Sequence, residues 1–370
     1  MASTHGFRIY VVQAFKNRVK DQEPEDLSTN SIARAEIIRL LDGLHEVGSY
    51  LIRPRSVPVG EPERPTRTVT VGDPMLVRDD LVHLVVSMGE SGSHRRATRP
   101  KKKSKDLAKW SPEADHNLTV LFPKRSGSEF IVIAQTIRRR DPAPEILRLL
   151  TQLGLTQMKN AQNIENSERQ QAKDDGRSIP KRIKYSRLLF RYRQAVDNSY
   201  IDEIMGSAKS ATAVFQSKIP SDRGADRPIV RRTLQIKLRD ENEREIGRRV
   251  GKHWFRLTRD GQSASAAEGV AELAAQLSDE DLFEDDEQRR YNSASVSVKS
   301  ETGASTTIAV DTLRDVFTYP VSDGLPSLRF YYEKVAPRVK IVAGEERIEV
   351  SAISPAEVEE CLGVSTSDLS

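Results

Sequence analysis

Apolar and polar positions form their clearest pattern between residues 117 and 140, NLTVLFPKRSGSEFIVIAQTIRRR. Two β-rich runs, 118–122 and 130–137, flank a cluster of turn-forming residues at 123–128. Two such runs joined by a short link that contains glycine predict an antiparallel hairpin. Both sides of the second run are apolar, which is typical of a central strand covered on both faces.

Apolar residues spaced three and four apart predict several helices. One spans 145–154, with Gly154 as its C-cap. Another spans 32–44, with Ser28 or Ser31 as its N-cap and Gly48 at its end. Further helices are predicted at 197–206, 263–277, 311–317 and 354–363.

Short β-rich runs outnumber these helices. Besides the hairpin, strands are predicted at 7–15, 49–57, 67–71, 81–88, 181–193, 228–238, 244–257, 293–300, 304–310, 327–333, 339–342 and 347–351. Runs of strands with few helices indicate an α+β fold with mixed or antiparallel sheets. We expect two domains, an N-terminal one at 1–156 and a C-terminal one at 181–370, joined by a polar linker at 157–180.

Composition limits the kind of protein. The chain has 370 residues, 37% of them hydrophobic. No stretch approaches the roughly 18 consecutive apolar residues that a membrane span requires, so no membrane association is expected. The N-terminal residues do not have the pattern of a signal peptide, and the single cysteine, Cys361, excludes an internal disulfide and a zinc site built from several cysteines. A reducing cytoplasm is the expected location.

Charge is spread unevenly although the net charge is only +4. Residues 181–259 hold 20 Lys and Arg against 9 Asp and Glu, whereas residues 260–370 hold 9 against 22. Such asymmetry indicates an anionic partner for the basic part. The alternative is that the basic and acidic parts neutralise each other within one fold.

Three stretches combine basic residues in patterns suited to nucleic acid. Residues 89–115 are predicted to form an exposed basic loop with Trp110 available for stacking, and 181–193 alternates basic with aromatic residues. Strands 228–238 and 244–257, paired through a turn, would form a positive ribbon. The candidate nucleic-acid-binding residues are Arg95, Arg96, Lys101, Lys102, Lys103, Arg187, Arg191, Arg193, Arg231, Arg232, Arg248, Arg249 and Lys252.

These observations predict a protein that binds DNA or RNA, in a role such as bacterial defence, mobile-element biology or regulation. Ordinary solvated loops and strands with outward-facing arginines explain the same patterns. A second hypothesis is a protein-interaction module whose basic surface docks an acidic partner or the chain's own acidic segment at 279–287.

A third hypothesis is a Mg²⁺-dependent nuclease, which needs clustered carboxylates. Its candidate residues are Asp73, Asp79, Asp80, Glu129 and Glu333 with Lys334. No phosphate-binding loop, dinucleotide-binding motif, nucleophile elbow or pair of histidines at metal-ligand spacing is found. The sequence therefore predicts no cofactor and no resident metal, and it leaves open whether the protein is an enzyme.

Overall fold

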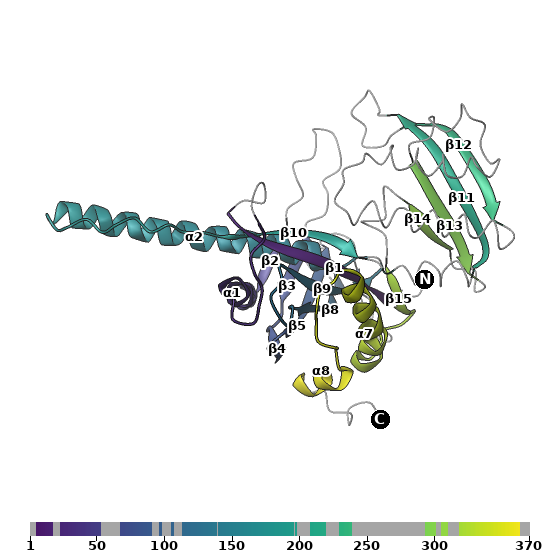
Figure 1. The fold of residues 1–370 in the computed structure, drawn as a ribbon, viewed down its shortest axis with the longest axis horizontal. Coiled ribbons are helices and arrows are strands. Elements are labelled where there is room, and N and C mark those ends of the chain that lie inside the picture. The colour runs from purple at the N-terminus through teal and green to yellow at the C-terminus, as the bar shows by residue number, and fades with distance from the viewer. Residues whose placement is uncertain are drawn as a thin grey trace. The chain divides into compact units, whose positions relative to one another are not determined.

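The computed structural model describes residues 5–17, 23–52, 67–90, 96–97, 105–106, 113–138, 140–195, 197, 208–219, 229–238, 293–300, 305–309 and 318–362. They form an α+β structure dominated by antiparallel strands, with four described helices (Figure 1). The predicted fold class is confirmed.

By the contacts among its residues, the chain divides into two compact units, 1–195 together with 318–370, and 196–317. This division differs from the predicted one, in which a linker at 157–180 separates the domains. Residues up to 174 of that segment are helical, and residues 318–362 join the N-terminal unit because they complete its sheet and cover one of its faces.

A nine-stranded sheet forms the centre of the first unit, in the order β10-β1-β9-β8-β5-β3-β2, with β15 also paired to β1 and β4 to β5. Every pairing in it is antiparallel. The strands are β1 (His5–Lys16), β2 (Ser49–Ile52), β3 (Arg67–Val71), β4 (Met75–Arg78), β5 (Leu81–Glu90), β8 (Glu113–Leu121), β9 (Glu129–Ile137), β10 (Leu188–Ala195) and β15 (Tyr319–Ser322).

The predicted hairpin is β8 and β9, which pair with Leu118 opposite Ala134. Strand β9 is central, with every residue from 130 to 136 buried, as the two-sided apolar pattern predicted. Strand β1 lies beside it and is buried along most of its length. Strands β3 and β5 form the predicted pair, and β4 adds to the same edge of β5.

Helices cover both faces of this sheet. On one face, side chains such as Val12, Val120 and Val132 form a core with the helices α1 (Ile32–Val47) and α2 (Ala143–Asp174). On the other face, α7 (Leu328–Glu345) packs through Tyr331 against Phe7, and the Tyr332 hydroxyl contacts His83 and Thr119. The short helix α8 (Pro355–Cys361) follows α7, with Ser354 as its N-cap, close to the predicted position.

Helix α1 begins and ends as the sequence predicted. The Ser31 side chain accepts a hydrogen bond from the Arg34 amide, and Gly48 has a φ of +79° at the C-terminus. A positive φ is costly for other residues, so glycine suits this position.

The prediction of strands at 327–333 and 339–342 is wrong, because both lie in or next to helix α7. Tyr331, Val335, Val339 and Val342 are buried, and their spacing follows one face of a helix. The aromatic and β-branched composition favours a strand in isolation, but packing against the sheet overrides that preference. Residues 348–354 have no regular secondary structure, so the strand predicted at 347–351 is also absent.

Helix α2 does not end at Gly154 as predicted. It continues to Asp174, and Gly154 is buried inside it against Leu40 of α1. The residues that follow are mainly Gln, Lys, Ala, Glu and Arg, which favour helix and outweigh one internal glycine.

The second unit contains a four-stranded antiparallel sheet in the order β12-β11-β13-β14. Its strands are β11 (Ala208–Ile219), β12 (Ile229–Leu238), β13 (Ser293–Ser300) and β14 (Ser305–Ala309). The strand predicted at 228–238 and the hairpin at 293–310 are confirmed. The predicted helices at 197–206, 263–277 and 311–317 and the strand at 244–257 lie outside the described residues, apart from Asp197, which is not helical.

Candidate nucleic-acid interface

The second half of α2 extends beyond the sheet (Figure 1). The first three turns bury Ile146, Leu147, Leu149 and Leu150 in the core, whereas only Glu165 and Ala172 are buried after Gly154. Residues 177–187, here called the return segment, run back along this part of the helix and lead into β10. We call residues 155–187 the arm.

The turn at the tip of the arm is a Schellman motif. Gly176 has a φ of +66°, and the Arg177 amide donates to the Ala172 carbonyl at 2.8 Å while the Gly176 amide donates to the Lys173 carbonyl at 3.2 Å. These two bonds satisfy carbonyls that the helix end would otherwise leave unpaired. The motif stops the helix and reverses the chain.

Polar contacts along the helix hold the return segment in place. The Glu165 carboxylate accepts a hydrogen bond from the Ile183 amide at 3.1 Å. Arg169 donates to the Pro180 carbonyl. Burial and the adjacent carboxylate of Glu165 raise the pKa of Tyr185. Glu165 is therefore buried because the return segment covers it.

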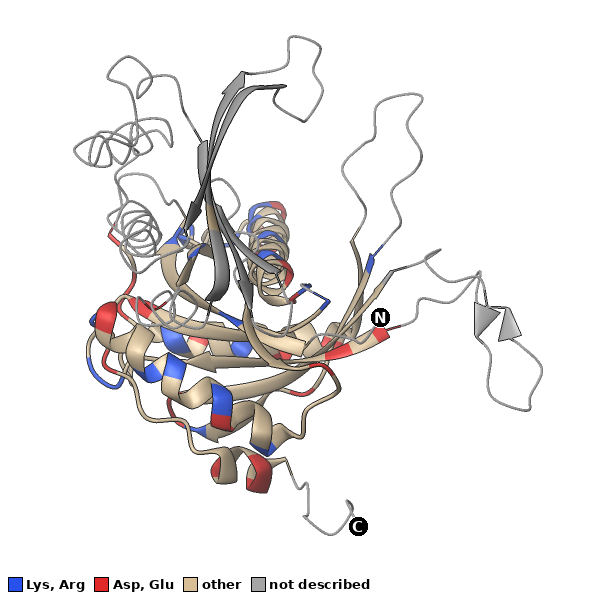
Figure 2. Cartoon of the chain, turned by 90° about the vertical axis from the view of Figure 1, so that its right-hand side faces the viewer, with Lys and Arg blue, Asp and Glu red and all other residues tan. Residues whose placement is uncertain are grey.

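Basic side chains occupy the exposed side of the return segment. Lys181, Arg182 and Lys184 are exposed, and within the described part of the chain no carboxylate forms an ion pair with them. Figure 2 colours the charged residues and shows both signs along helix α2 itself. The return segment thus presents three positive charges within four residues that are free to contact an anion.

A groove lies between α1, the beginning of the arm's helix and the return segment, and we call it the arm groove. Its volume is about 510 Å³. Its lining residues are Glu36, Arg39, Gly154, Gln157, Met158, Asn160, Ala161, Ile164, Tyr185 and Ser186. Arg39 donates to Gln157 at 2.6 Å and to Glu36, so the charges on the α1 side neutralise each other.

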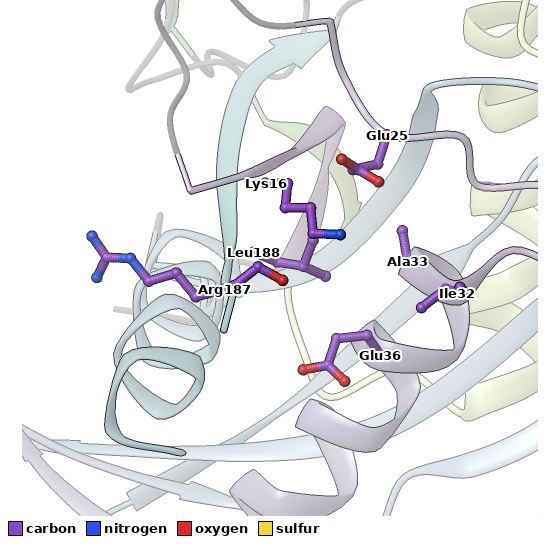
Figure 3. Close-up of a pocket in the computed structure, with 8 residues that line it drawn as sticks. Lys16, Glu25, Ile32, Ala33, Glu36, Arg187 and Leu188 are labelled. Atoms are coloured by element: carbon purple, nitrogen blue, oxygen red, sulfur yellow. The ribbon is translucent and has the colours of Figure 1, made fainter. Parts of the chain in front are cut away.

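A smaller pocket of about 240 Å³ lies on the other side of Ser186, between the end of β1, the start of α1 and the start of β10 (Figure 3). Lys16, Glu25 and Glu36 line it, together with Arg187, whose guanidinium extends away from the space between the others (Figure 3). This mixture of charges gives the pocket no clear preference for an anion.

Strand β10 at the edge of the sheet carries two of the predicted arginines. Arg191 is exposed, opposite Gln13 of β1. Arg193 forms a bidentate ion pair with Glu346 at the end of α7, with an Nη1–Oε1 distance of 2.6 Å. Arg193 is thus engaged within the unit, whereas Arg191 is available at its surface.

The remaining predicted residues lie in other parts of the chain. Arg96 lies in β6 (Arg96–Ala97), which pairs with β7 (Lys105–Asp106), and Arg231 and Arg232 lie in β12. Only the backbone of these three is described. The predicted residues outside the described ranges are Arg95, Lys101, Lys102, Lys103, Arg248, Arg249 and Lys252, so their role stays a prediction.

Two of the candidate nuclease carboxylates, Asp80 and Glu129, have structural partners. Asp80 is buried and accepts from Arg78 at 2.7 Å, and Arg78 also binds Glu357 of α8. Glu129 accepts from Gln13 at 2.9 Å, and burial raises its pKa against the opposing effect of Arg193. Among the described residues, no group of three or more histidine, cysteine or acidic side chains is arranged to hold a metal ion.

Lys181, Arg182 and Lys184 were absent from the residues that we predicted, although they lie in the basic stretch 181–193. That stretch was interpreted as one strand, but the strand begins only at Leu188. The signal that separates the two parts is composition, because 181–184 contains three basic residues and one isoleucine, whereas 188–190 is wholly apolar.

Comparison with protein-family models, with curated protein sequences and with solved structures finds no match for this chain. None of the described helices combines the length and the apolar content that crossing a membrane requires.

Proposed function

We propose that the protein binds nucleic acid and that the return segment supplies the main phosphate contacts. The observation that supports this is the exposure of Lys181, Arg182 and Lys184 on a segment anchored along α2, where no carboxylate of the described residues is paired with them. Each lysine or arginine that neutralises a phosphate releases condensed counterions, which makes such contacts favourable at moderate salt.

Anchoring of the backbone strengthens the proposal. A flexible basic tail loses conformational entropy when it binds, whereas the return segment is already held by Glu165 and Arg169. Arg191 on β10, which continues from the return segment, extends the same positive surface.

The test is a fluorescence-anisotropy titration of labelled single- and double-stranded oligonucleotides over a range of salt concentrations. The variant Lys181→Gln, Arg182→Gln, Lys184→Gln removes the three charges. We expect weaker binding and a salt-dependence slope that is smaller by about 2 for single strands, because each lost phosphate contact reduces it by about 0.7.

The matched control removes three exposed charges from α7, as Arg329→Gln, Lys334→Gln, Lys340→Gln. It lowers the net charge by the same amount as the variant of the return segment. It therefore separates the effect of local phosphate contacts from that of the overall charge of the protein. Equal weakening by both variants, or no binding by the wild-type protein at low salt, would contradict the proposal.

A protein-interaction module is the second candidate, and exposed apolar side chains on the arm favour it. Ile164, Ile179 and Ile183 are 60%, 48% and 63% exposed. Exposed apolar residues that lie close together indicate protein contacts. If this candidate is correct, Ile164→Ser, Ile179→Ser, Ile183→Ser abolishes self-association in analytical ultracentrifugation while oligonucleotide affinity is unchanged.

A further inference from the structure

The arm groove has the chemistry of a nucleobase site. Met158, Ala161 and Ile164 of α2 give it an apolar wall, and Tyr185 of the return segment adds an aromatic ring. The groove has a volume of about 510 Å³ and is open to solvent along its length. Stacking between a base and an aromatic ring needs such a wall and tolerates any base sequence.

Amide side chains are placed where the edge of a base could be hydrogen-bonded. Gln157 accepts from Arg39 through its Oε1 atom, which leaves its NH₂ group as a donor. Asn160 also lines the groove, and no hydrogen bond to its side chain is found among the described residues. Base edges present both donors and acceptors, so two neighbouring amides suit them.

Charge connects this groove to the phosphate contacts. Tyr185 directly follows Lys184 in the chain, so a nucleotide with its base against Tyr185 has its phosphate close to the exposed basic side chains. Glu36 is paired with Arg39, so the side chains that line the groove carry no net charge, although the carboxylates of Glu165 and Glu168 are close enough to Tyr185 to raise its pKa. A chain of phosphates can therefore follow the return segment while one base turns into the groove.

We propose that the arm groove binds one unpaired base of a single-stranded DNA or RNA, stacked on Tyr185, while Lys181, Arg182 and Lys184 contact the phosphates. This inference rests on the proposed function and adds a preference for single strands. A base within a duplex is stacked and paired, so it cannot enter the groove without being extruded.

The experiment compares Tyr185→Leu, Tyr185→Phe and Ala161→Leu with the wild type, using a labelled 15-nucleotide oligothymidine and a duplex of 15 base pairs. Tyr185→Leu removes the ring, and we expect about 5- to 150-fold weaker binding of the single strand and less than a twofold change for the duplex. Ala161→Leu places a larger side chain in the groove from α2 and is also expected to weaken binding of the single strand. Tyr185→Phe keeps the ring and retains most of the affinity.

A direct readout does not depend on affinity. An oligonucleotide that contains 5-iodouracil is irradiated in complex with the full-length protein, and the cross-linked peptide is sequenced. Cross-links to Tyr185 or Met158 support the inference. Cross-links confined to other segments overturn it, as does equal loss of single-strand and duplex binding in Tyr185→Leu.

The two proposals fail in different ways. If the wild-type protein binds neither probe, both are overturned. If the lysine and arginine variant of the return segment loses binding but Tyr185→Leu and Ala161→Leu do not, phosphate binding stands and the groove is not a base site. If association with a protein partner alone responds to Ala161→Leu, the groove belongs to a protein interface instead.

Discussion

At the scale of single residues, a buried ion pair joins the start of the sheet to the start of α2. The Arg8 guanidinium donates to Asp141 at 2.7 Å, and the Tyr10 hydroxyl donates to the same carboxylate at 3.1 Å. The Ala143 amide also donates to Asp141, at the first residue of the helix. Burial raises the pKa of Asp141, although Arg8 and Tyr10 oppose the shift.

Replacing Arg8 by methionine is expected to destabilise the protein by about 3–5 kcal/mol at neutral pH, because Asp141 would remain charged and buried without its partner. The destabilisation should be smaller at acidic pH, where Asp141 takes up a proton and no longer carries a charge. Urea unfolding measured at several pH values gives both quantities.

The control is Arg39→Met, which breaks the Arg39–Glu36 pair, where the side chains are 54% and 32% exposed. Exposed pairs contribute about 0–1 kcal/mol. If both variants lowered the free energy of unfolding by similar amounts, the buried Arg8–Asp141 pair would contribute no more to stability than an exposed pair.

His83 links the sheet to α7 and is a buried histidine. Its Nδ1 atom lies 2.8 Å from the Tyr332 hydroxyl, and burial lowers its pKa to about 4. Below pH 6.5 protons therefore bind the unfolded chain more readily than the folded one, and stability falls as the pH drops from 6.5 towards 4. The contribution of this residue over that window is about 3 kcal/mol.

In His83→Leu we therefore expect the free energy of unfolding to fall less between pH 6.5 and 4 than in the wild type. Thr119→Val is the control, since it removes the other hydroxyl contact of Tyr332 without removing a titrating group. Urea unfolding at both pH values is the measurement. If the free energy of unfolding of His83→Leu fell as much as that of the wild type, His83 would not be the cause of the loss of stability in acid.

At the scale of elements, the sequence predicted those parts in which local pattern and burial agree. The hairpin β8–β9 and helix α1 have clear apolar periodicity and turn or cap residues at their ends, so both were predicted correctly. Helix α7 was not, because its tyrosines and valines favour strands and Pro337 interrupts the helical pattern. Only its contact with the sheet through Tyr331 and Tyr332 explains the helix.

The candidate interface could be predicted only in part. Basic and aromatic residues at 181–193 are visible in the sequence, as is Arg191. The arm groove is not, since it needs α2 to continue beyond Gly154 and the chain to turn at Gly176. Glycine at either position is a plausible helix end, and only three-dimensional contacts distinguish them.

The two glycines give a paired test of where α2 ends. Gly154→Ala places a methyl group at 3.9 Å from its nearest neighbours, an ordinary contact, and should stabilise the protein by about 0.5–1 kcal/mol. Gly176→Ala forces a side chain into a positive φ and should cost about 1–2 kcal/mol at the tip of the arm. Thermal unfolding and amide hydrogen exchange measure these effects. If Gly154→Ala destabilised the protein and Gly176→Ala stabilised it, the result would indicate a helix that ends at Gly154.

At the scale of the whole molecule, the first unit is built from two separate parts of the chain. Strands β10 and β15 both pair with β1, with Ala195 opposite Ile9 and Tyr319 opposite Phe7. Between them, Thr318 accepts a hydrogen bond from Arg8 at 3.1 Å. Strand β15 therefore continues along the edge of β1 where β10 stops. Residues 196–317 are inserted in the chain between these two strands, which pair with the same edge of β1.

This register predicts that Ala195 can be joined directly to Thr318. We expect the shortened chain to fold, because Thr318 would lie opposite Arg8 without a change in pairing. Cooperative urea unfolding and protected amides in β1, monitored by hydrogen exchange, are the measurements. A control deletion that joins Leu189 to Thr318 removes most of β10 and should abolish cooperative unfolding.

The same insertion affects how the protein is made on the ribosome. Strands β1, β8, β9 and β10 are complete by residue 195, but helix α7, which covers Phe7 and His83, begins at residue 328. At about 5–20 residues per second, the intervening roughly 130 residues take roughly 6–26 s to synthesise. During that time α7 does not cover one apolar face of the nascent sheet, and we expect this face to bind the chaperones that protect growing chains.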